Sequence, residues 1–304
     1  MRQIMVVGAN PAWQKIVRCE HLVPGEVVRV KKCQGGAAGK GFNCAQAIAA
    51  LGESALLVTG IGIDGDSWRS ACRDHRLEVF ELPLAGEIRT ATTIQEADGT
   101  VTEIVEEGPA AAGWSQEALE ERMSAHPIDW PLALCGTFPE GFDLGRIAAR
   151  LEGRSAMVLV DSIPLARELL QRPVHCPGLV LKLNFTEWKS VTQHWTVDGV
   201  LSEVRKRLGE VRLVLTAGED GAYAEDGSGR RRHFPVSRHT QGSQVHPIGA
   251  GDAFSAGVLV ANARDLPFLE ACSFGSVAAQ LSCRHPLPSR LVRDEVDRVW
   301  AELA

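Results

Sequence analysis

Short apolar runs alternate with helix-like segments along most of the chain, and this rhythm limits the fold more than any other feature. Each run has the composition of a strand buried on both faces of a sheet. The expected strands cover residues 4–8, 54–62, 132–136, 156–161, 178–184 and 211–218. The expected helices cover residues 41–51, 66–76, 115–125, 143–152, 163–171 and 196–208, with three more after residue 250. This alternation predicts an α/β fold with a mainly parallel central sheet and helices on both faces.

Two β-rich segments break the rhythm. Residues 12–33 predict two short strands joined by a turn at Pro24-Gly25, and residues 87–106 predict a hairpin with its turn at "ADGT". Both lie after the carboxyl ends of expected sheet strands, where α/β proteins bind ligands. We expect them to form a small β lid, although an ordinary edge extension of the sheet would show the same periodicity. Because no linker or internal repeat appears, we expect one domain over residues 1–304 that carries this lid.

Charge and cysteine usage exclude several classes of function. The net charge of −6 provides no global field that would attract nucleic acid or acidic membranes. The eight cysteines contain no C-x-x-C pair, so they predict reduced thiols in an intracellular protein rather than a zinc or redox motif. No apolar run reaches the length of a membrane span, and the first residues turn polar too early for a secretory signal. We therefore expect a cytoplasmic protein that binds neither nucleic acid nor membranes.

Two glycine-rich stretches could hold phosphate, at residues 35–43 and 249–257. The first fails as a P-loop, because Gln34 stands where the motif needs glycine and Gly41 stands where it needs Ser or Thr. The second fails as a dinucleotide fingerprint, because Phe254 occupies the place of the third glycine. Neither stretch is one of the two common nucleotide-binding motifs.

The second stretch still predicts an anion site. Gly249, Ala250 and Gly251 precede a helical pattern, so their N–H groups lie at a helix N-terminus, where the dipole favours an anion such as a phosphoryl group. Asp252 lies in the first turn beside that site and could accept a proton from an attacking hydroxyl. By itself the pattern favours Asp252 as a helix cap over Asp252 as a catalytic base.

Seven motifs in order, nearly from end to end of the chain, resemble the ribokinase-like, or PfkB, family of carbohydrate kinases. The resemblance is strongest to the branch that acts on hexose phosphates, which contains 1-phosphofructokinases and tagatose-6-phosphate kinases. The segments that carry it are "NPAWQKIVRCEHLVPGEVVRV", "AAGKGFN", "RTATTIQEADGTVTEIVEEGP", "CGTFPEGF", "LKLNFTEW", "LTAGEDGAY" and "IGAGDAFSAG". The resemblance implies a ribokinase-like fold and transfer of phosphate from ATP to a hydroxyl of a sugar phosphate.

The resemblance also implies residue roles. Asp252 would be the general base, and the N–H groups of Gly249, Ala250 and Gly251 would form the anion hole. The acceptor would be bound by Gln14, Gly39, Lys40, Asn43 and Arg89, with the arginine at the acceptor's own phosphate. ATP would be bound by Asn184, Glu187, Thr216, Gly218, Gly221 and Ser276. Asn184 and Glu187 would also organise Mg²⁺, through water. By analogy with the family, two lids would pack together in a homodimer.

The chain departs from the family pattern at three places. Gln14 stands where the family has an aspartate that binds sugar hydroxyls, and Ala38 replaces the first glycine of the G-G-K-G motif. His246-Pro247 replaces an Asp/Asn-Thr pair, which removes support for a monovalent-cation site. Gln14 leaves the identity of the sugar and of its reacting hydroxyl open. Two alternatives therefore remain, a kinase of a free sugar or nucleoside and a catalytically weak sensor of sugar phosphates or nucleotides on the same fold.

Overall fold

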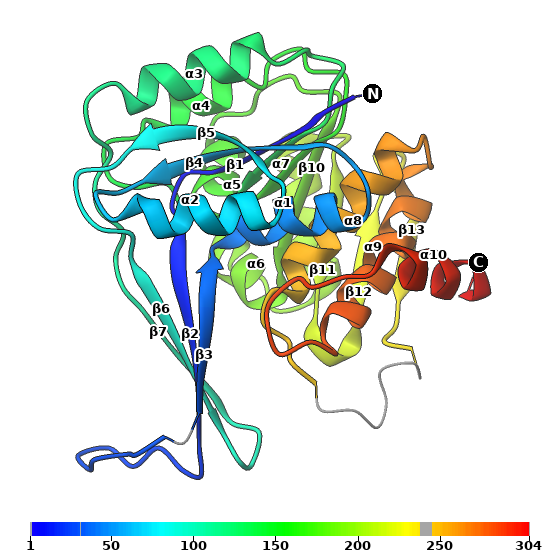
Figure 1. Cartoon of the computed structure of the whole chain (residues 1–304). Coiled ribbons are helices and arrows are strands. Elements are labelled where there is room, and N and C mark those ends of the chain that lie inside the picture. The colour runs from blue at the N-terminus through cyan, green and yellow to red at the C-terminus, as the bar shows by residue number, and fades with distance from the viewer. Residues whose placement is uncertain (1, 31, 238–244, 304) are drawn as a thin grey trace.

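The computed structural model describes residues 2–30, 32–237 and 245–303, and its main body is built on one large sheet (Figure 1). The strand order is β13-β12-β11-β10-β9-β8-β1-β4-β5. Neighbours are parallel from β11 through to β5, and only the β11–β12 and β12–β13 pairs are antiparallel. The strands are β1 (Ile4–Gly8), β4 (Ala55–Ile61), β5 (Glu78–Pro83), β8 (Leu132–Cys135), β9 (Val158–Asp161), β10 (Leu179–Asn184), β11 (Arg212–Thr216), β12 (Ala222–Glu225) and β13 (Arg231–Phe234). The predicted α/β fold with a mainly parallel sheet is confirmed.

Helices cover both faces of this sheet, because the central strands are apolar on both sides. On β1, Ile4 and Val6 pack into one core cluster, and Met5 and Val7 pack into the other. The first layer contains α1 (Lys40–Ala50), α2 (Gly65–Asp74), α8 (Ala250–Ala263), α9 (Phe268–Ser282) and α10 (Arg293–Leu303). The second layer contains α3 (Ser115–Ala125), α4 (Leu144–Ala149), α5 (Ile163–Gln171), α6 (Phe185–Thr192) and α7 (Val197–Leu208). None of the helices in the described ranges is both long and apolar enough to cross a membrane.

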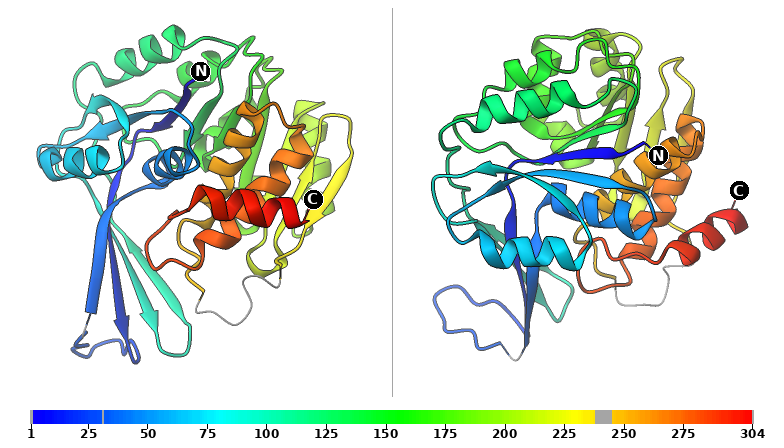
Figure 2. Two further views of the ribbon diagram at one scale, coloured as in Figure 1. Left: turned by 45° about the vertical axis from the view of Figure 1, so that its right-hand side comes forward. Right: turned by 45° about the horizontal axis from the view of Figure 1, so that its top comes forward.

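A second, four-stranded sheet projects from one side of the body in every view, and we call it the lid sheet (Figures 1 and 2). Its order is β3-β2-β6-β7, in which β2 and β6 are parallel and the outer pairs antiparallel. The strands are β2 (Ala12–Cys19), β3 (Lys32–Ala38), β6 (Thr90–Glu96) and β7 (Val101–Val105). Both β-rich segments of the sequence therefore contribute to one small sheet.

The second strand of the first segment lies later than predicted. We expected it within residues 12–33, but β3 begins at Lys32 and continues through the glycines that had been considered as a phosphate loop. The pairing with β2 explains this position, because Gly35 lies against the backbone of Gln14. A Cβ built on Gly35 would stand 2.2 Å from the Gln14 carbonyl oxygen, so the glycine permits close contact between the two strands.

The elements that were missed include β5, the β12–β13 pair and α6, and helix α4 was predicted too long. Strand β5 is an edge strand with partly exposed residues, so it lacks the continuous apolar run that marks the central strands. Helix α6 is short and follows β10 directly, with Asn184 as its N-cap. Helix α4 covers Leu144–Ala149 instead of 143–152, and Asp143 caps it by accepting a hydrogen bond from the Arg146 N–H.

Candidate active site

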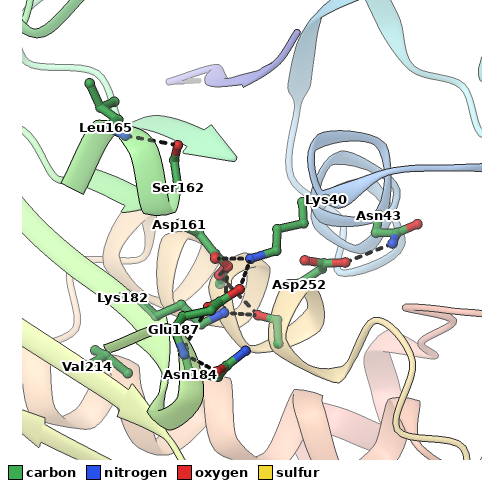
Figure 3. A network of polar contacts seen from close by, with 12 residues as sticks. Lys40, Asn43, Asp161, Ser162, Leu165, Lys182, Asn184, Glu187, Val214 and Asp252 are labelled. Atoms are coloured by element: carbon green, nitrogen blue, oxygen red, sulfur yellow. Dashed lines mark hydrogen bonds and ion pairs between the residues drawn. The ribbon is translucent and has the colours of Figure 1, made fainter. Parts of the chain in front are cut away.

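The candidate site lies where the carboxyl ends of β9 and β10 meet the N-termini of α1 and α8. Strand β9 ends at Asp161, and β10 ends at Asn184, which directly precedes α6. Lys40 begins α1 on the opposite side, and Asp252 lies in the first turn of α8 (Figure 3). Ligands of parallel α/β sheets bind at this edge, so the fold brings these side chains to the expected place.

Asp252 is a buried carboxylate held by a partner from another helix. The residue is 7% exposed, and its Oδ2 accepts a hydrogen bond of 2.8 Å from Nδ2 of Asn43 on α1. Burial and the nearby charge of Asp161 raise the pKa of Asp252 to about 6, against the opposing effects of Lys40, Lys182 and Asn43. The carboxylate is thus ionised at neutral pH and a stronger base than an exposed aspartate.

The start of α8 leaves backbone donors open. Gly249 is the N-cap with φ of 78°, a left-handed conformation that favours glycine. Within the described residues, the N–H groups of Gly249, Gly251 and Asp252 have no hydrogen-bond partner, whereas that of Ala250 donates to the Pro247 carbonyl at 3.1 Å. The set of open donors therefore differs from the expected one, since Ala250 is engaged in a turn and the Asp252 N–H is open. Open donors at a helix N-terminus favour an anion.

Asp161 and Lys182 form a buried ion pair that the sequence analysis missed. Lys182 Nζ lies 2.5 Å from Asp161 Oδ2, and the two side chains are 3% and 1% exposed. Burial alone would raise the pKa of Asp161, but the charges and hydrogen bonds of Lys182 and Lys40 lower it to about 2. The signal was present in the sequence, because Lys182 is a charged residue inside an apolar strand and Asp161 ends another.

Lys40 points toward the acidic side of the site. Its Nζ lies 2.8 Å from Asp161 Oδ1 and 2.9 Å from Glu187 Oε1, so one ammonium joins carboxylates from β9 and α6 (Figure 3). Burial opposes its charge, but Asp161, Glu187 and Asp252 outweigh burial and raise the pKa of Lys40. Lys40 is therefore a fixed cation beside Asp252, on the side where Glu187 lies.

Asn184 and Glu187 form a capping box at the start of α6. The Glu187 N–H donates to Asn184 Oδ1 at 2.8 Å, and the Asn184 N–H donates to Glu187 Oε2 at 2.9 Å. This exchange orients both side chains at the edge of the site. The Asn184 Nδ2 group donates to no other described residue.

The lid sheet contributes Gln14 and, from the residue before β6, Arg89. Gln14 Nε2 donates to the Ala91 carbonyl at 3.1 Å and to Thr93 Oγ1 at 2.9 Å, which uses both of its protons. Arg89 donates to the carbonyls of Pro11, Glu106 and Asn10 at 3.3, 3.4 and 3.5 Å. All of its hydrogen-bond partners among the described residues are backbone carbonyls, and burial lowers the pKa of Arg89.

The remaining predicted residues lie on neighbouring elements. Thr216 ends β11 and pairs in register with Asn184 of β10, which places the loop after it next to α6. Gly218 and Gly221 flank a short 3₁₀ turn with φ of 59° and 84°. Ser276 lies on α9, 7% exposed, and its Oγ accepts from Gln280 Nε2 at 3.0 Å. The loop glycines thus lie beside α6, whereas the Ser276 hydroxyl is engaged within its own helix.

The fold is that of ribokinase-like kinases. Phosphofructokinase-2 from Escherichia coli, solved with substrates and products, superimposes with a TM-score of 0.85 at 21% identity, covering 100% of this chain and 99% of that chain. Ribokinase from Thermotoga maritima superimposes with a TM-score of 0.76 at 20% identity, covering 99% of this chain and 100% of that one. These similarities show that the chain has the same overall fold as these proteins.

Sequence comparison places the chain within that class. The model of the pfkB family of carbohydrate kinases matches residues 1–293, so the chain belongs to this family and is a carbohydrate kinase. A 1-phosphofructokinase from Xanthomonas campestris pv. campestris is 28% identical over 284 residues, which cover 89% of this chain and 87% of that protein.

Proposed function

We propose that this kinase transfers the γ-phosphoryl group of ATP to a hydroxyl of a sugar phosphate, with Asp252 as the general base. The observation that carries the proposal is a buried carboxylate with a pKa near 6, placed beside open backbone donors at the start of α8. Phosphoryl transfer needs a base, charge neutralisation and positioning, and this arrangement supplies all three. The similarity to a 1-phosphofructokinase supports a phosphorylated hexose as acceptor.

The roles of the residues follow from their places. Asp252 takes the proton from the acceptor hydroxyl, while the N–H groups of Gly249, Gly251 and Asp252 hold the transferred phosphoryl group. Asn43 orients the carboxylate of Asp252. Lys40 stabilises charge on the transferred group, since its ammonium lies among the carboxylates on the nucleotide side rather than in the lid sheet.

ATP is expected to lie along the edge formed by α6 and the loop after β11. Asn184 Nδ2 is available to a phosphate, and Thr216, Gly218 and Gly221 lie on the neighbouring loop, which we expect to contact the nucleotide. Ser276 on α9 is a proposed contact with the adenine base of ATP. No cluster of three or more His, Cys, Asp or Glu that could hold a metal occurs in the described residues. The donor set therefore fits a Mg²⁺ carried by the ATP phosphates and reached by Glu187 and Asn184 through water.

The acceptor is expected between the lid sheet and α1. Gln14 donates both amide protons to β6, so only its Oε1 remains to accept a hydrogen bond from a sugar hydroxyl. The Oε1 atom of Gln14 would then accept a hydrogen bond as one oxygen of an aspartate does, but without the negative charge. Arg89, without an acid partner among the described residues, supplies a cation for the acceptor's phosphate. Gly39, the N-cap of α1 with φ of 105°, lets the backbone bend sharply between the lid sheet and Lys40.

A homodimer through the lid sheet and a cytoplasmic location complete the proposal. Strand β7 exposes the apolar side chains of Val101, Ile104 and Val105, which a second lid sheet would cover. All eight cysteines are free thiols, as expected in a reducing compartment.

The test of the function is ADP release with MgATP and a panel of acceptors. The panel contains fructose 1-phosphate, fructose 6-phosphate, tagatose 6-phosphate, the free hexoses and nucleosides. Turnover with one or more hexose phosphates, and at least tenfold less with the free sugars, supports the proposal. Preference for a free sugar or nucleoside would assign a different acceptor, and thermal stabilisation by these ligands without turnover would indicate a sensor.

Arg89→Gln should separate a phosphorylated acceptor from an unphosphorylated one. We expect its KM for the phosphorylated acceptor to rise by about tenfold to a hundredfold, because a hydrogen bond to a charged group contributes about 1.5–3 kcal/mol. The KM for MgATP should stay unchanged. Arg298→Gln on α10, which removes an exposed arginine paired with Glu302, is the control. An Arg89→Gln enzyme with an unchanged acceptor KM would remove Arg89 from the acceptor site.

The pH profile should report the titration of Asp252. A base must be unprotonated, so kcat should fall as the pH drops through about 6, the raised pKa of this carboxyl. Above that value the group is ionised and this limb is flat. Initial rates measured across the acid range, with tryptophan fluorescence recorded to confirm folding, provide the check. An acid limb at the pKa of an ordinary exposed aspartate would contradict the assignment of buried Asp252 as the general base.

A further inference from the structure

The carbonyl oxygen of Gly251 is held by two buried side chains. Lys182 Nζ donates to it at 3.0 Å from β10, and Ser255 Oγ donates to it at 3.1 Å from one turn further along α8. Both donors also contact Asp161 Oδ2, at 2.5 Å and 3.2 Å. Lys182, Ser255 and Asp161 thus close a hydrogen-bonded network around a single backbone oxygen, and no other side chain of the described residues donates to that oxygen.

This oxygen belongs to the peptide unit that also carries the open Asp252 N–H. The peptide is planar, so fixing the direction of the Gly251 C=O also fixes the direction of that N–H on the opposite side. An ammonium at the carbonyl oxygen polarises the whole unit and makes the N–H a better donor. Two side-chain donors therefore act, through one peptide bond, on a group that faces the phosphoryl site.

The burial of these charges argues for a role beyond packing. Lys182, Asp161 and Ser255 are 3%, 1% and 0% exposed. A buried ion pair loses so much hydration that apolar side chains of similar size often stabilise a core equally well. The close fit extends to the backbone, since a Cβ on Gly251 would lie 3.0 Å from Lys182 Nζ. Hydrophobic residues of similar size could therefore stabilise the folded protein equally well at these positions.

We propose that Lys182, Asp161 and Ser255 are positioning residues that brace the Gly251–Asp252 peptide as part of the anion hole. The inference rests on the proposed phosphoryl transfer, because it assigns the source of one donor's orientation in that reaction. None of the three side chains needs to touch the transferred group. Their effect should therefore appear in the rate of transfer and not in the binding of the substrates.

Ser255→Ala is the mildest test, and Ser282→Ala is its matched control. Both serines are almost fully buried in long helices, and Ser282 donates to the Ala279 carbonyl of its own helix. We expect Ser255→Ala to lower kcat about tenfold with both KM values within about twofold, since losing an anion-hole donor outright costs about 10²–10³ in kcat. Ser282→Ala should keep the wild-type kcat. Equal kcat in the two variants would overturn the brace.

Lys182→Met tests the charged member. We expect a kcat about a hundredfold lower, and an acid limb of the pH profile that moves to higher pH because Lys182 lowers the pKa of Asp252. A merely structural loss would lower the melting temperature while the folded enzyme kept the wild-type kcat. A folded Lys182→Met enzyme with wild-type kcat and limb would contradict the proposal. If this variant does not fold, Ser255→Ala decides.

Binding of MgADP with aluminium fluoride tests the brace without an acceptor. This fluoride complex mimics a transferring phosphoryl group, and calorimetry on the wild-type chain and on Ser255→Ala compares their anion holes. We expect Ser255→Ala to bind the complex at least about fivefold more weakly and MgADP alone equally well. Equal affinity, or no fluoride binding by the wild-type chain, would overturn the brace. Failure of the acceptor panel would instead refute the sugar-phosphate acceptor and leave this result standing.

Discussion

Asp252→Asn is expected to lower kcat by about 10³-fold, the effect of removing a general base from its proton. Asparagine has the same shape, and its Oδ1 can still accept the hydrogen bond from Asn43 Nδ2. It lacks the basic carboxylate, so the acceptor hydroxyl has no group to take its proton. The KM for MgATP should change little, because the backbone donors at the start of α8 remain.

Stability separates this loss from unfolding. The folded state raises the pKa of Asp252, so above about pH 6 the ionised carboxylate is less favourable in the folded than in the unfolded chain. At pH 8 the Asn variant should therefore melt at or above the temperature of the wild-type protein. Asp294→Asn, which changes an exposed first-turn aspartate of α10, is the control and should leave kcat unchanged. Near-normal kcat with a lower melting temperature would mean that Asp252 only supports its helix.

The structure already weighs against the helix-cap alternative. The cap residue of α8 is Gly249, and no side chain caps this helix start. The Asp252 carboxylate instead accepts a hydrogen bond from Asn43, which lies on a helix 209 positions earlier in the chain. The sequence could predict the first-turn position of Asp252, because that depends on local pattern. It could not decide between cap and base, because that depends on a partner brought by the fold.

The same distinction explains what else was predicted and what was missed. Apolar runs define the central strands by themselves, so the sheet and its two helix layers follow from pattern. Asp161 and Lys182 were missed as a pair. In the sequence, Asp161 is only the polar residue that ends one apolar run, and Lys182 is a single charged residue within another. Their pairing becomes visible only when β9 and β10 lie side by side. The open amide of Asp252 was missed for a related reason, since only the turn from Pro247 to Ala250 shows which donors are used.

The contacts of Lys40 favour a role other than the sugar contact that the family motif implied. The family motif implied a contact with the sugar, whereas its ammonium lies between Asp161 of β9 and Glu187 of α6. Two carboxylates hold it there, and neither belongs to the lid sheet. In the proposed function, the phosphates of ATP bring further negative charge to this side of the site. The ammonium is then placed to neutralise charge that develops on the transferred group.

Lys40→Met should therefore lower kcat by about 10²- to 10³-fold, the cost of losing a cation that stabilises the transition state. Two further signs should accompany the loss. The KM for the acceptor should stay within about threefold, and the acid limb of the pH profile should move upward, because Lys40 lowers the pKa of Asp252. Steady-state rates over the acid range measure both, and Lys206→Met on exposed α7 surface is the control.

The split between kcat and KM decides between the two roles for Lys40. A residue that only holds the sugar contributes to acceptor binding before and during transfer, so its loss raises the acceptor KM and leaves kcat largely intact. A residue that neutralises the moving phosphoryl group contributes in the transition state, so its loss lowers kcat. A large rise in acceptor KM at wild-type kcat would return Lys40 to the sugar side. Because the ammonium is already bound by Glu187, whose other oxygen accepts from the Asn184 N–H, we expect the nucleotide-side result.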